Sequence, residues 1–288
     1  MEDKKRIIII DSNSVIHRAF HALPPLTTKS GEMVNAVYGF LLVFFKAIKE
    51  FKPDYIVACF DFPAPTFRHE KYKEYKAKRV KAPPELYNQI PKTKEVLGAF
   101  GVQVFEKEGF EADDLIGTIA ESVSNAGIET VILSGDTDNF QLINSHVKVY
   151  NLRKGVKDTV LYDENLVKEK YLGLKPEQLL DLRALRGDQS DNIPGVPGVG
   201  EKTATSLILE FGALETIYDN LALITSKIRE KLAQNKEQAF LSKELAEIKK
   251  DVPIDFSLEG CSFSGYDRDA AQKILEKLEF YSLIPRLP

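Results

Sequence analysis

Four short apolar runs separated by helix-like segments constrain the fold of this chain more than any other feature. They lie at residues 6–10, 55–60, 102–105 and 129–133. The first is apolar on both faces, as are strands of a parallel sheet that helices cover on both sides. The segments between them have helical spacing at residues 34–51, 85–100 and from Ala112 onward. This alternation predicts a doubly wound α/β fold with a mostly parallel central sheet, and the runs at 147–150 and 159–162 predict edge strands.

The pattern changes after Tyr171, where the strand-like runs stop. Helical spacing with short turns takes over at residues 176–185, 201–211, 214–218, 222–232, 237–249 and 267–278. A chain of 288 residues is long enough for one large domain or two ordinary ones. We therefore expect an α/β domain over residues 1–172 and a mostly α-helical subdomain over residues 173–288.

Acidic residues follow the predicted strands at the point where each strand ends. They are Asp11, Asp61, the pair Asp136 and Asp138, and the cluster Glu111, Asp113 and Asp114, which opens the helix after the third strand. A solvated acidic helix start is the simpler interpretation of residues 111–114 taken alone. Because ligands of such sheets bind outside the carboxyl ends of the strands, the recurrence instead predicts that seven carboxylates gather at one edge.

Seven acids in one pocket cannot all stay ionised without countercharge, because like charges raise one another's pKa. All-oxygen ligands without His or Cys point to Mg²⁺ or Mn²⁺, and this many carboxylates suggests two or more ions, as in phosphoryl transfer. An EF-hand is disfavoured for Asp136 and Asp138, since Phe140 stands where that loop needs an oxygen ligand. Asp188 and Asp191 close a helix, where the dipole disfavours acids, so we also interpret them as metal ligands.

Charge and hydropathy narrow the class of partner. The net charge is −4, but seven Lys or Arg residues lie between residues 68 and 81 against two acids. Such a segment beside an acidic centre suits a polyanion, although a solvated basic face is the common alternative. No run of eighteen apolar residues exists, so we expect no transmembrane helix and no membrane partner. Two apolar-flanked cysteines, Cys59 and Cys261, fit a reducing, cytoplasmic location.

A glycine-rich turn lies between two predicted helices, from Gly195 to Ala204. It is not a P-loop, because Glu201 is inserted into that motif and no strand precedes it. Gly198 and Gly200 allow close approach of a phosphate, and the following helix offers free N–H groups. Such a hairpin grips a nucleic-acid backbone without reading bases. A tight turn between helices remains an equal alternative on this motif alone.

Taken together, these motifs resemble the 5′-nuclease domain of bacterial DNA polymerase I, within the wider flap endonuclease family. The resemblance covers nearly the whole chain. Its markers include Phe67-Arg68-His-Glu, Tyr75-Lys76-Ala-Lys-Arg79, Gly109-Phe-Glu-Ala-Asp-Asp-Leu115, Ser134-Gly-Asp-Thr-Asp138, Gly187-Asp-Gln-Ser-Asp-Asn-Ile-Pro-Gly195 and Gly198-Val-Gly-Glu-Lys-Thr203. It implies nine metal-site acids, which are Asp11, Asp61, Glu111, Asp113, Asp114, Asp136, Asp138, Asp188 and Asp191.

The resemblance also implies roles for the basic segment and the hairpin. Residues of about 66–84 correspond to a helical arch through which a 5′ single strand passes. Lys76 and Arg79 are expected to stabilise transition-state charge, and Tyr75 to stack on a base near the cut. The hairpin matches a helix–three-turn–helix element that binds duplex DNA and often holds K⁺. The residues expected to bind DNA are Arg68, Gly198, Gly200, Lys202 and Thr203.

The implied activity is a 5′–3′ exonuclease and structure-specific flap endonuclease. It would hydrolyse DNA phosphodiesters near single-strand/duplex junctions by two-metal catalysis, in primer removal and repair. Its expected substrates are 5′-flapped or nicked duplexes and RNA-primed ends, with a DNA polymerase as functional partner. The chain ends at Pro288 without a polymerase part, as a stand-alone enzyme or an excised domain would. A metal-dependent RNase and a non-catalytic DNA-binding module are the rival hypotheses.

Overall fold

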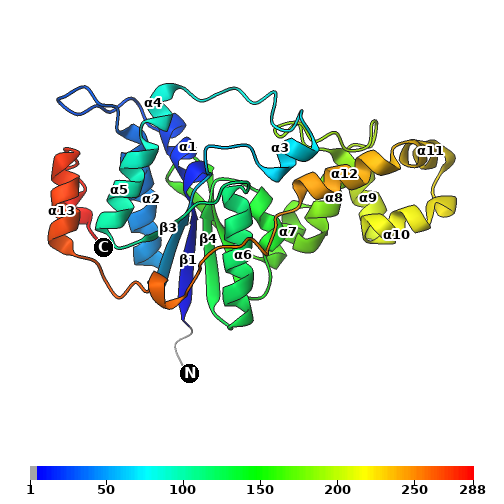
Figure 1. Cartoon of the computed structure of the whole chain (residues 1–288). Helices are drawn as coiled ribbons and strands as arrows, with labels where there is room; N and C mark the ends of the chain where they lie inside the picture. The colour runs from blue at the N-terminus through cyan, green and yellow to red at the C-terminus, as the bar shows by residue number, and fades with distance from the viewer. Residues whose placement is uncertain (1–4) are drawn as a thin grey trace.

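A six-stranded sheet forms the centre of the computed structural model, which describes residues 5–288 (Figure 1). The strand order is β3-β2-β1-β4-β5-β6, with β1 to β5 parallel and β6 antiparallel to β5. The strands are β1 Arg6–Asp11, β2 Tyr55–Cys59, β3 Gln103–Phe105, β4 Glu129–Ser134, β5 Val147–Lys154 and β6 Asp158–Tyr162. This confirms the predicted α/β fold. The prediction that β5 is an edge strand is wrong, because β5 lies between β4 and β6.

Helices cover both faces of the sheet, as the apolar strands require. In β1, Ile8 and Ile10 join the core that α1 and α2 cover, whereas Ile7 and Ile9 join the core of α6 on the opposite face. Successive strand residues point to opposite faces, so a strand without polar positions needs two covers. The helices of this half are α1 Ser12–Ala22, α2 Asn35–Phe51, α3 Phe67–Lys71, α4 Pro84–Tyr87, α5 Ile90–Ala99, α6 Ala112–Asn125 and α7 Glu164–Lys170.

The predicted helix at 85–100 is wrong in one respect, because α4 ends before α5 begins. Pro91 stands in the first turn of α5, and it has no N–H to continue a helix from α4. Gln89, between the two helices, is buried and donates through Nε2 to Asn35 Oδ1 at 3.1 Å, while its Oε1 accepts from the N–H of Ala36 at 2.8 Å. The break therefore anchors the start of α2. The helices α1 and α7 were not predicted. In the segment of about 66–84, expected to form a helical arch, α3 is helical and residues 72–83 form turns and loop.

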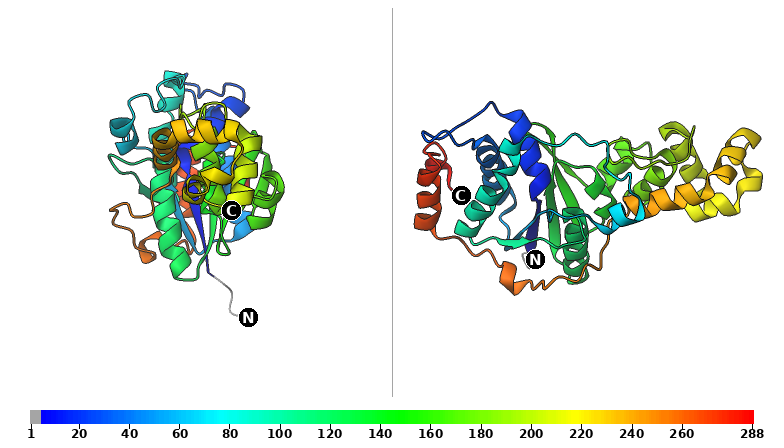
Figure 2. Two further views of the ribbon diagram at one scale, coloured as in Figure 1. Left: turned by 90° about the vertical axis from the view of Figure 1, so that its right-hand side faces the viewer. Right: turned by 45° about the horizontal axis from the view of Figure 1, so that its top comes forward.

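Helices α8 to α12 extend beyond one end of the sheet (Figure 2). Their bounds are α8 Leu179–Arg186, α9 Glu201–Phe211, α10 Leu214–Asp219, α11 Ser226–Gln234 and α12 Lys236–Ala246, with short 3₁₀ turns η2 Pro176–Gln178 and η3 Leu221–Leu223. The glycine turn predicted between two helices joins α8 to α9. The carboxyl ends of the strands and the start of this helical part meet at one place, where η1 (Asp138–Leu142) contacts α8.

The end of the chain returns to the sheet. After α12, residues 247–267 contain only the short turn η4 (Glu259–Cys261), and α13 (Arg268–Lys277) packs against α5 at the far end of the molecule (Figure 2). Ile274 and Leu275 lie in the same apolar core as α2. The subdomain expected over 173–288 thus does not include α13, which belongs to the α/β core. Within residues 5–288, no helix is both long and apolar enough to span a bilayer.

Candidate metal centre

A cavity of about 460 Å³ opens at the carboxyl ends of the strands. Seven of the nine acids singled out from the sequence line it: Asp11, Asp61, Glu111, Asp113, Asp136, Asp138 and Asp191. They come from β1, the loop after β2, the start of α6, the turn after β4 and the turn after α8. The parallel strands bring their ends to one edge, and the helical part adds Asp191 from the opposite wall.

Asp11 is held in place by its neighbours before any ligand is present. Its Oδ1 accepts from the N–H of Ser14 at 3.2 Å, which caps α1, and Oδ2 accepts from Ser134 Oγ at 2.6 Å. Burial and the charges of Asp136 and Asp61 together raise the pKa of Asp11 to about 7, although the Ser134 hydrogen bond acts to lower it. The strand end thus holds a carboxylate that is costly to ionise without a cation.

Asp61 and Asp113 face similar conditions. Asp61 Oδ1 accepts from the N–H of Ala112 at 2.8 Å, and Asp113 Oδ1 accepts from Asn139 Nδ2 at 2.9 Å. Burial raises the pKa of both carboxyls, and for Asp113 the nearby Asp11 charge adds to the rise. Within residues 5–288, no salt bridge joins Asp11, Asp61, Asp113 or Asp136 to a basic side chain.

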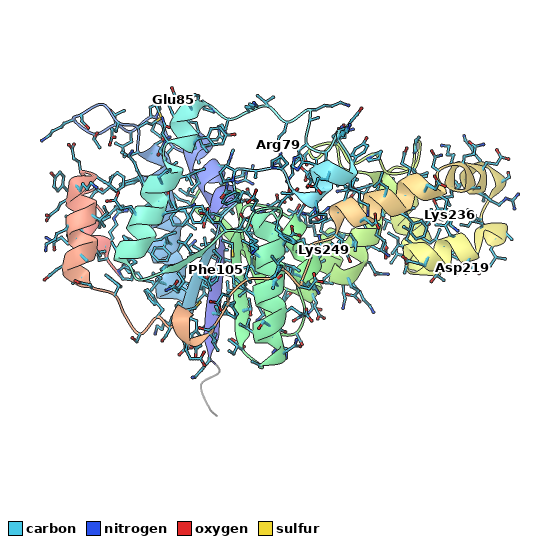
Figure 3. All side chains as sticks on the ribbon, in the orientation of Figure 1. Arg79, Glu85, Phe105, Asp219, Lys236 and Lys249 are labelled. Carbon is cyan, nitrogen blue, oxygen red and sulfur yellow. The ribbon has the colours of Figure 1, made fainter. Side chains whose placement is uncertain are left out.

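Basic residues of the connection between α3 and α4 reach the outer wall of this cavity. Lys76 Nζ donates to Glu111 Oε1 at 2.8 Å, and Arg79 Nη2 donates to Asp191 Oδ1 at 2.9 Å. Burial acts to raise the pKa of Glu111, but the Lys76 and Arg68 charges outweigh it and hold that pKa below its usual value. Figure 3 labels Arg79 on this connection and Glu85 in α4, where the connection ends, and the connection passes over the carboxyl ends of the strands.

Asp114 does not belong to this cavity. Its side chain is fully buried, and its two oxygens accept four hydrogen bonds, from Arg68 Nη1 and Nη2 at 2.7 and 2.8 Å and from the N–H groups of Glu111 and Lys249 at 3.0 and 2.9 Å. A carboxylate has about four acceptor sites. All are used, so the structure contradicts the prediction of Asp114 as a metal ligand. Its neighbour Asp113, turned by about 100° on the helix, faces the cavity instead.

Two residues of the basic segment also differ from expectation. Arg68, predicted to bind DNA, is 2% exposed, and besides Asp114 it donates to the carbonyls of Leu245 and Glu247 at 2.9 and 2.7 Å. Tyr75 is 3% exposed, and its hydroxyl lies 3.1 Å from Glu111 Oε2 and 3.2 Å from Asp191 Oδ2. In this conformation Arg68 is a buried tie between α3 and α12, and the ring of Tyr75 has no face free for a base.

The two acids after α8 separate in role. Asp191 lines the cavity, whereas Asp188 lies outside its lining. The Oδ1 of Asp188 accepts from the N–H and the Oγ of Ser190 at 2.8 and 2.6 Å, and these bonds, against burial, lower the pKa of Asp188. Its Oδ2 lies 4.0 Å from Arg183 Nε. Asp188 and Asp138 thus share Arg183 as a basic neighbour.

Sequence reasoning missed the polar residues that orient the acids. Ser134 and Asn139 hold Asp11 and Asp113, Asn13 Oδ1 accepts from the N–H of Asp61 at 3.2 Å, and Arg183 binds Asp138. Asn13, Ser134 and Asn139 stand beside the acids at the same strand ends, which is a signal that was present in the sequence. Arg183 lies in the middle of a helix and carries no such signal.

The donor chemistry of the cavity fits divalent cations that prefer oxygen. Seven carboxylates line it, and four of them have no basic partner among the described residues, so added positive charge would relieve their repulsion. As the side chains stand, no group of three acidic, His or Cys residues within 5–288 is arranged to hold a metal ion. Mg²⁺ usually keeps several of its own waters and binds through one or two carboxylates, so the cavity can take such ions without a complete protein cage.

The glycine hairpin presents the residues that were expected to contact DNA. Gly198, Gly200 and Lys202 are exposed, and Thr203 is half-buried in the first turn of α9. Gly198 has φ +77°, a backbone conformation that suits glycine, and its carbonyl accepts from Lys231 Nζ at 2.8 Å. The Gly198 carbonyl thus has an ammonium group as a partner, and K⁺ binding at the hairpin stays a prediction.

Comparison with known proteins places the chain in a family. Residues 6–172 match the family described as 5'-3' exonuclease, N-terminal resolvase-like domain, and residues 174–269 match 5'-3' exonuclease, C-terminal SAM fold. DNA polymerase I of Bacillus subtilis is 44% identical over 288 residues, which are 100% of this chain and 33% of that protein. DNA polymerase I of Caldicellulosiruptor bescii is 45% identical over 284 residues, 98% of this chain and 33% of that protein.

Solved structures share the fold. The bacteriophage T5 D15 flap endonuclease, as a complex with DNA and metal ions, has a TM-score of 0.72 at 20% identity, and the match covers 96% of this chain and 100% of that one. The catalytic core of Rad2 with DNA substrate has a TM-score of 0.61 at 19% identity, covering 99% and 93%. The chain spans about a third of the length of the polymerases that it matches. By its matches along residues 6–172 and 174–269, the chain belongs to the 5'-3' exonuclease family.

Proposed function

We propose that this chain is a divalent-metal-dependent 5′ nuclease, which acts on DNA as a 5′–3′ exonuclease and as a structure-specific flap endonuclease. The observation that carries the proposal is the cavity at the strand ends, where seven carboxylates converge and four have no basic partner within residues 5–288. A protein that only bound DNA would gain nothing from such a negative centre, because phosphates and carboxylates repel each other. A negative centre between basic walls suits a polyanion that meets bound cations.

Mg²⁺ or Mn²⁺, two or more ions, would be held by the acids that line the cavity: Asp11, Asp61, Glu111, Asp113, Asp136, Asp138 and Asp191. Bound there, such ions activate water and stabilise charge on the attacking and leaving oxygens of phosphoryl transfer. Ser134 and Asn139 keep Asp11 and Asp113 oriented toward the cavity through the hydrogen bonds described above. The acid side of the site is therefore organised before a ligand arrives.

Lys76 and Arg79 are proposed to contact the scissile phosphate. In the ligand-free arrangement each neutralises a cavity carboxylate, Glu111 for Lys76 and Asp191 for Arg79. Once other cations neutralise those acids, the two side chains are free to turn toward phosphate oxygens, where they stabilise the charge of the transition state. Arg79, at 54% side-chain exposure against 20% for Lys76, is the more exposed of the two.

The duplex side of the substrate is assigned to the glycine hairpin. Gly198 and Gly200 allow a phosphate close approach, and Lys202 and Thr203 lie in the first turn of α9, where free N–H groups favour an anion. These contacts would grip the backbone of a 5′-flapped or nicked duplex without reading its sequence. The proposed setting is cytoplasmic primer removal and repair, including RNA-primed ends, alongside a DNA polymerase.

The test is cleavage of a 5′-flapped duplex with Mg²⁺ and with EDTA. The proposal predicts cleavage near the junction with Mg²⁺, none in EDTA, and none by Asp136→Ala. Cleavage that persists in EDTA contradicts the metal account. Faster cleavage of single-stranded RNA than of flap DNA favours the RNase hypothesis, and stabilisation by Mg²⁺ without turnover favours the DNA-binding module.

A further inference from the structure

A buried arginine stands between the two halves of the molecule, beside the acids at the back of the cavity. Arg183 lies in α8, and its side chain is 5% exposed. Its Nη2 donates to Asp138 Oδ1, and its Nε lies 4.0 Å from Asp188 Oδ2. Asp138 comes from the α/β half and Asp188 from the helical half, so one guanidinium spans acids from both.

A gain in folding stability does not explain why Arg183 is buried at this position. Burying a guanidinium costs free energy unless every N–H finds an acceptor, and buried ion pairs are weak evidence for stability. Its Nη1 is buried and finds no hydrogen-bond partner among the residues that the structure describes. The neighbouring residues Leu182 and Leu185 of α8 are buried and apolar, so an apolar side chain at position 183 would also suit the packing of the helix. A role in the site accounts better for a buried, incompletely bonded arginine.

The contact with Asp138 fixes one carboxylate oxygen and leaves the other. Oδ1 of Asp138 is held by Arg183, no other basic side chain among the described residues pairs with this carboxylate, and the residue lines the cavity. The Lys76 and Arg79 side chains reach their acid partners from the connection between α3 and α4, which lacks helix and strand. Arg183 instead comes from the interior, so its contact does not depend on that connection.

We propose that Arg183 is a positioning residue, which holds the carboxylates of Asp138 and Asp188 in place at the edge of the cavity so that Asp138 can bind one divalent cation. The inference rests on the proposed function, because it assumes that the cavity takes such ions. Partners that orient metal ligands typically change metal affinity by about 10- to 100-fold when they are removed. Removal of Arg183 should therefore weaken one ion and leave the others.

The matched control lies three residues further along α8. Arg186 is 28% exposed at its side chain, and it pairs with Glu201 on the surface at 2.7 Å, away from the cavity lining. Arg183→Met and Arg186→Met thus make the same chemical change on one helix. Arg183→Lys keeps the charge but offers a single point donor, which cannot serve Asp138 and Asp188 together.

The experiment measures bound Mn²⁺ by EPR on the whole chain without DNA, and the Mg²⁺ dependence of flap cleavage. For Arg183→Met we expect one Mn²⁺ to bind about 10- to 100-fold more weakly, with an equal shift in the Mg²⁺ concentration for half-maximal cleavage. Arg183→Lys should lie between Arg183→Met and the unchanged protein, and Arg186→Met should match the unchanged protein.

Two outcomes overturn the inference. If Arg183→Met lowers thermal stability but leaves Mn²⁺ binding like that of Arg186→Met, Arg183 is only structural. If Mn²⁺ binds more tightly to Arg183→Met, the arginine competes with the ion instead of seating its ligand. Absence of Mn²⁺ binding and of cleavage in the unchanged protein would instead contradict the proposed function, so the two failures are distinguishable.

Discussion

Arg68 and Asp114 form a two-pronged ion pair in the interior, with Nη1–Oδ2 and Nη2–Oδ1 separations of 2.7 and 2.8 Å. The pair joins α3 to α6, and Arg68 also reaches the chain just after α12. Parallel hydrogen bonds between a guanidinium and a carboxylate fix direction as well as distance. This ion pair fixes the position of α3, and with it the start of the connection between α3 and α4 that carries Lys76.

The first prediction concerns this buried pair. Arg68→Met leaves Asp114 as an unpaired buried charge, so we expect a loss of about 3–5 kcal/mol in the free energy of unfolding. Urea unfolding measures it. Lys277→Met removes a surface pair with Glu95, at 64% side-chain exposure, and should change stability by no more than about 0.5 kcal/mol. An Arg68→Met protein as stable as the control would contradict the structural role and would favour the original expectation that Arg68 binds DNA.

The second prediction is a pH dependence that a metal removes. The pKa of Asp11 is raised from 3.8 to about 7 in the folded protein, so the folded state binds its proton more tightly than the unfolded state. Stability should therefore fall as pH rises from about 4 to about 7 in EDTA, by on the order of 1.4 kcal/mol per unit of pKa shift. Mg²⁺ should abolish the fall, because it neutralises the carboxylates.

The matched variants for this effect are Asp11→Asn and Asp163→Asn. Both carboxylates cap a helix, Asp11 for α1 and Asp163 for α7, and only Asp11 lies in the acid cluster. In EDTA at pH 8, Asp11→Asn should be more stable than the unchanged protein and Asp163→Asn should not. Thermal unfolding across pH measures this. Equal pH profiles for Asp11→Asn and the unchanged protein would contradict the electrostatic account.

The third prediction separates chemistry from binding at the basic segment. Lys76→Met removes an ammonium proposed to contact the scissile phosphate, and we expect turnover to fall by about 10²- to 10³-fold, with little change in duplex affinity. Lys78→Met, two residues away at an exposed position, should leave turnover unchanged. Single-turnover cleavage and fluorescence anisotropy provide the two readouts. A loss of affinity with unchanged turnover would make Lys76 a simple anchor.

The fourth prediction tests the hairpin with two glycines of positive φ at opposite ends of α9. Gly198 has φ +77° and Gly212 has φ +88°, so alanine is strained at both and should lower stability. Only Gly198→Ala adds a methyl group at the expected phosphate contact, where it also displaces Lys231. Duplex affinity should therefore fall for Gly198→Ala and not for Gly212→Ala. Equal effects of the two substitutions on duplex affinity would favour the alternative that the hairpin is only a tight turn between helices.

The sequence sufficed for the sheet and for the acids at the strand ends. Buried strands such as β1 are continuous apolar runs, and parallel strands bring whatever follows them to one edge, so Asp11 and Asp136 were placed by local pattern and topology. The same reasoning could not tell which of two adjacent acids at the start of α6 faces the cavity. Asp113 and Asp114 are adjacent, and which of them faces the cavity depends on Arg68, 46 residues away, a contact that no local pattern encodes.

Contacts between residues that are distant in the chain could not be predicted from the sequence either. Tyr75 was expected to stack on a base because such residues often do, but Glu111 and Asp191 capture its hydroxyl from two separate elements. The helix α13 has ordinary helical spacing, yet its apolar face packs against α5 and not against α8 to α12, the helices just before it in the chain. Spacing predicts that an element forms; it does not say which neighbour covers it.

The central claim is that the carboxylates at the strand ends converge because divalent cations neutralise them. Anomalous scattering from a Mn²⁺-soaked crystal tests it most directly. The account predicts two or more Mn²⁺ peaks within the cavity, bound by residues such as Asp11, Asp113 and Asp136, and none at Asp114. A cavity without peaks at saturating Mn²⁺, with the acids still converged, would contradict it.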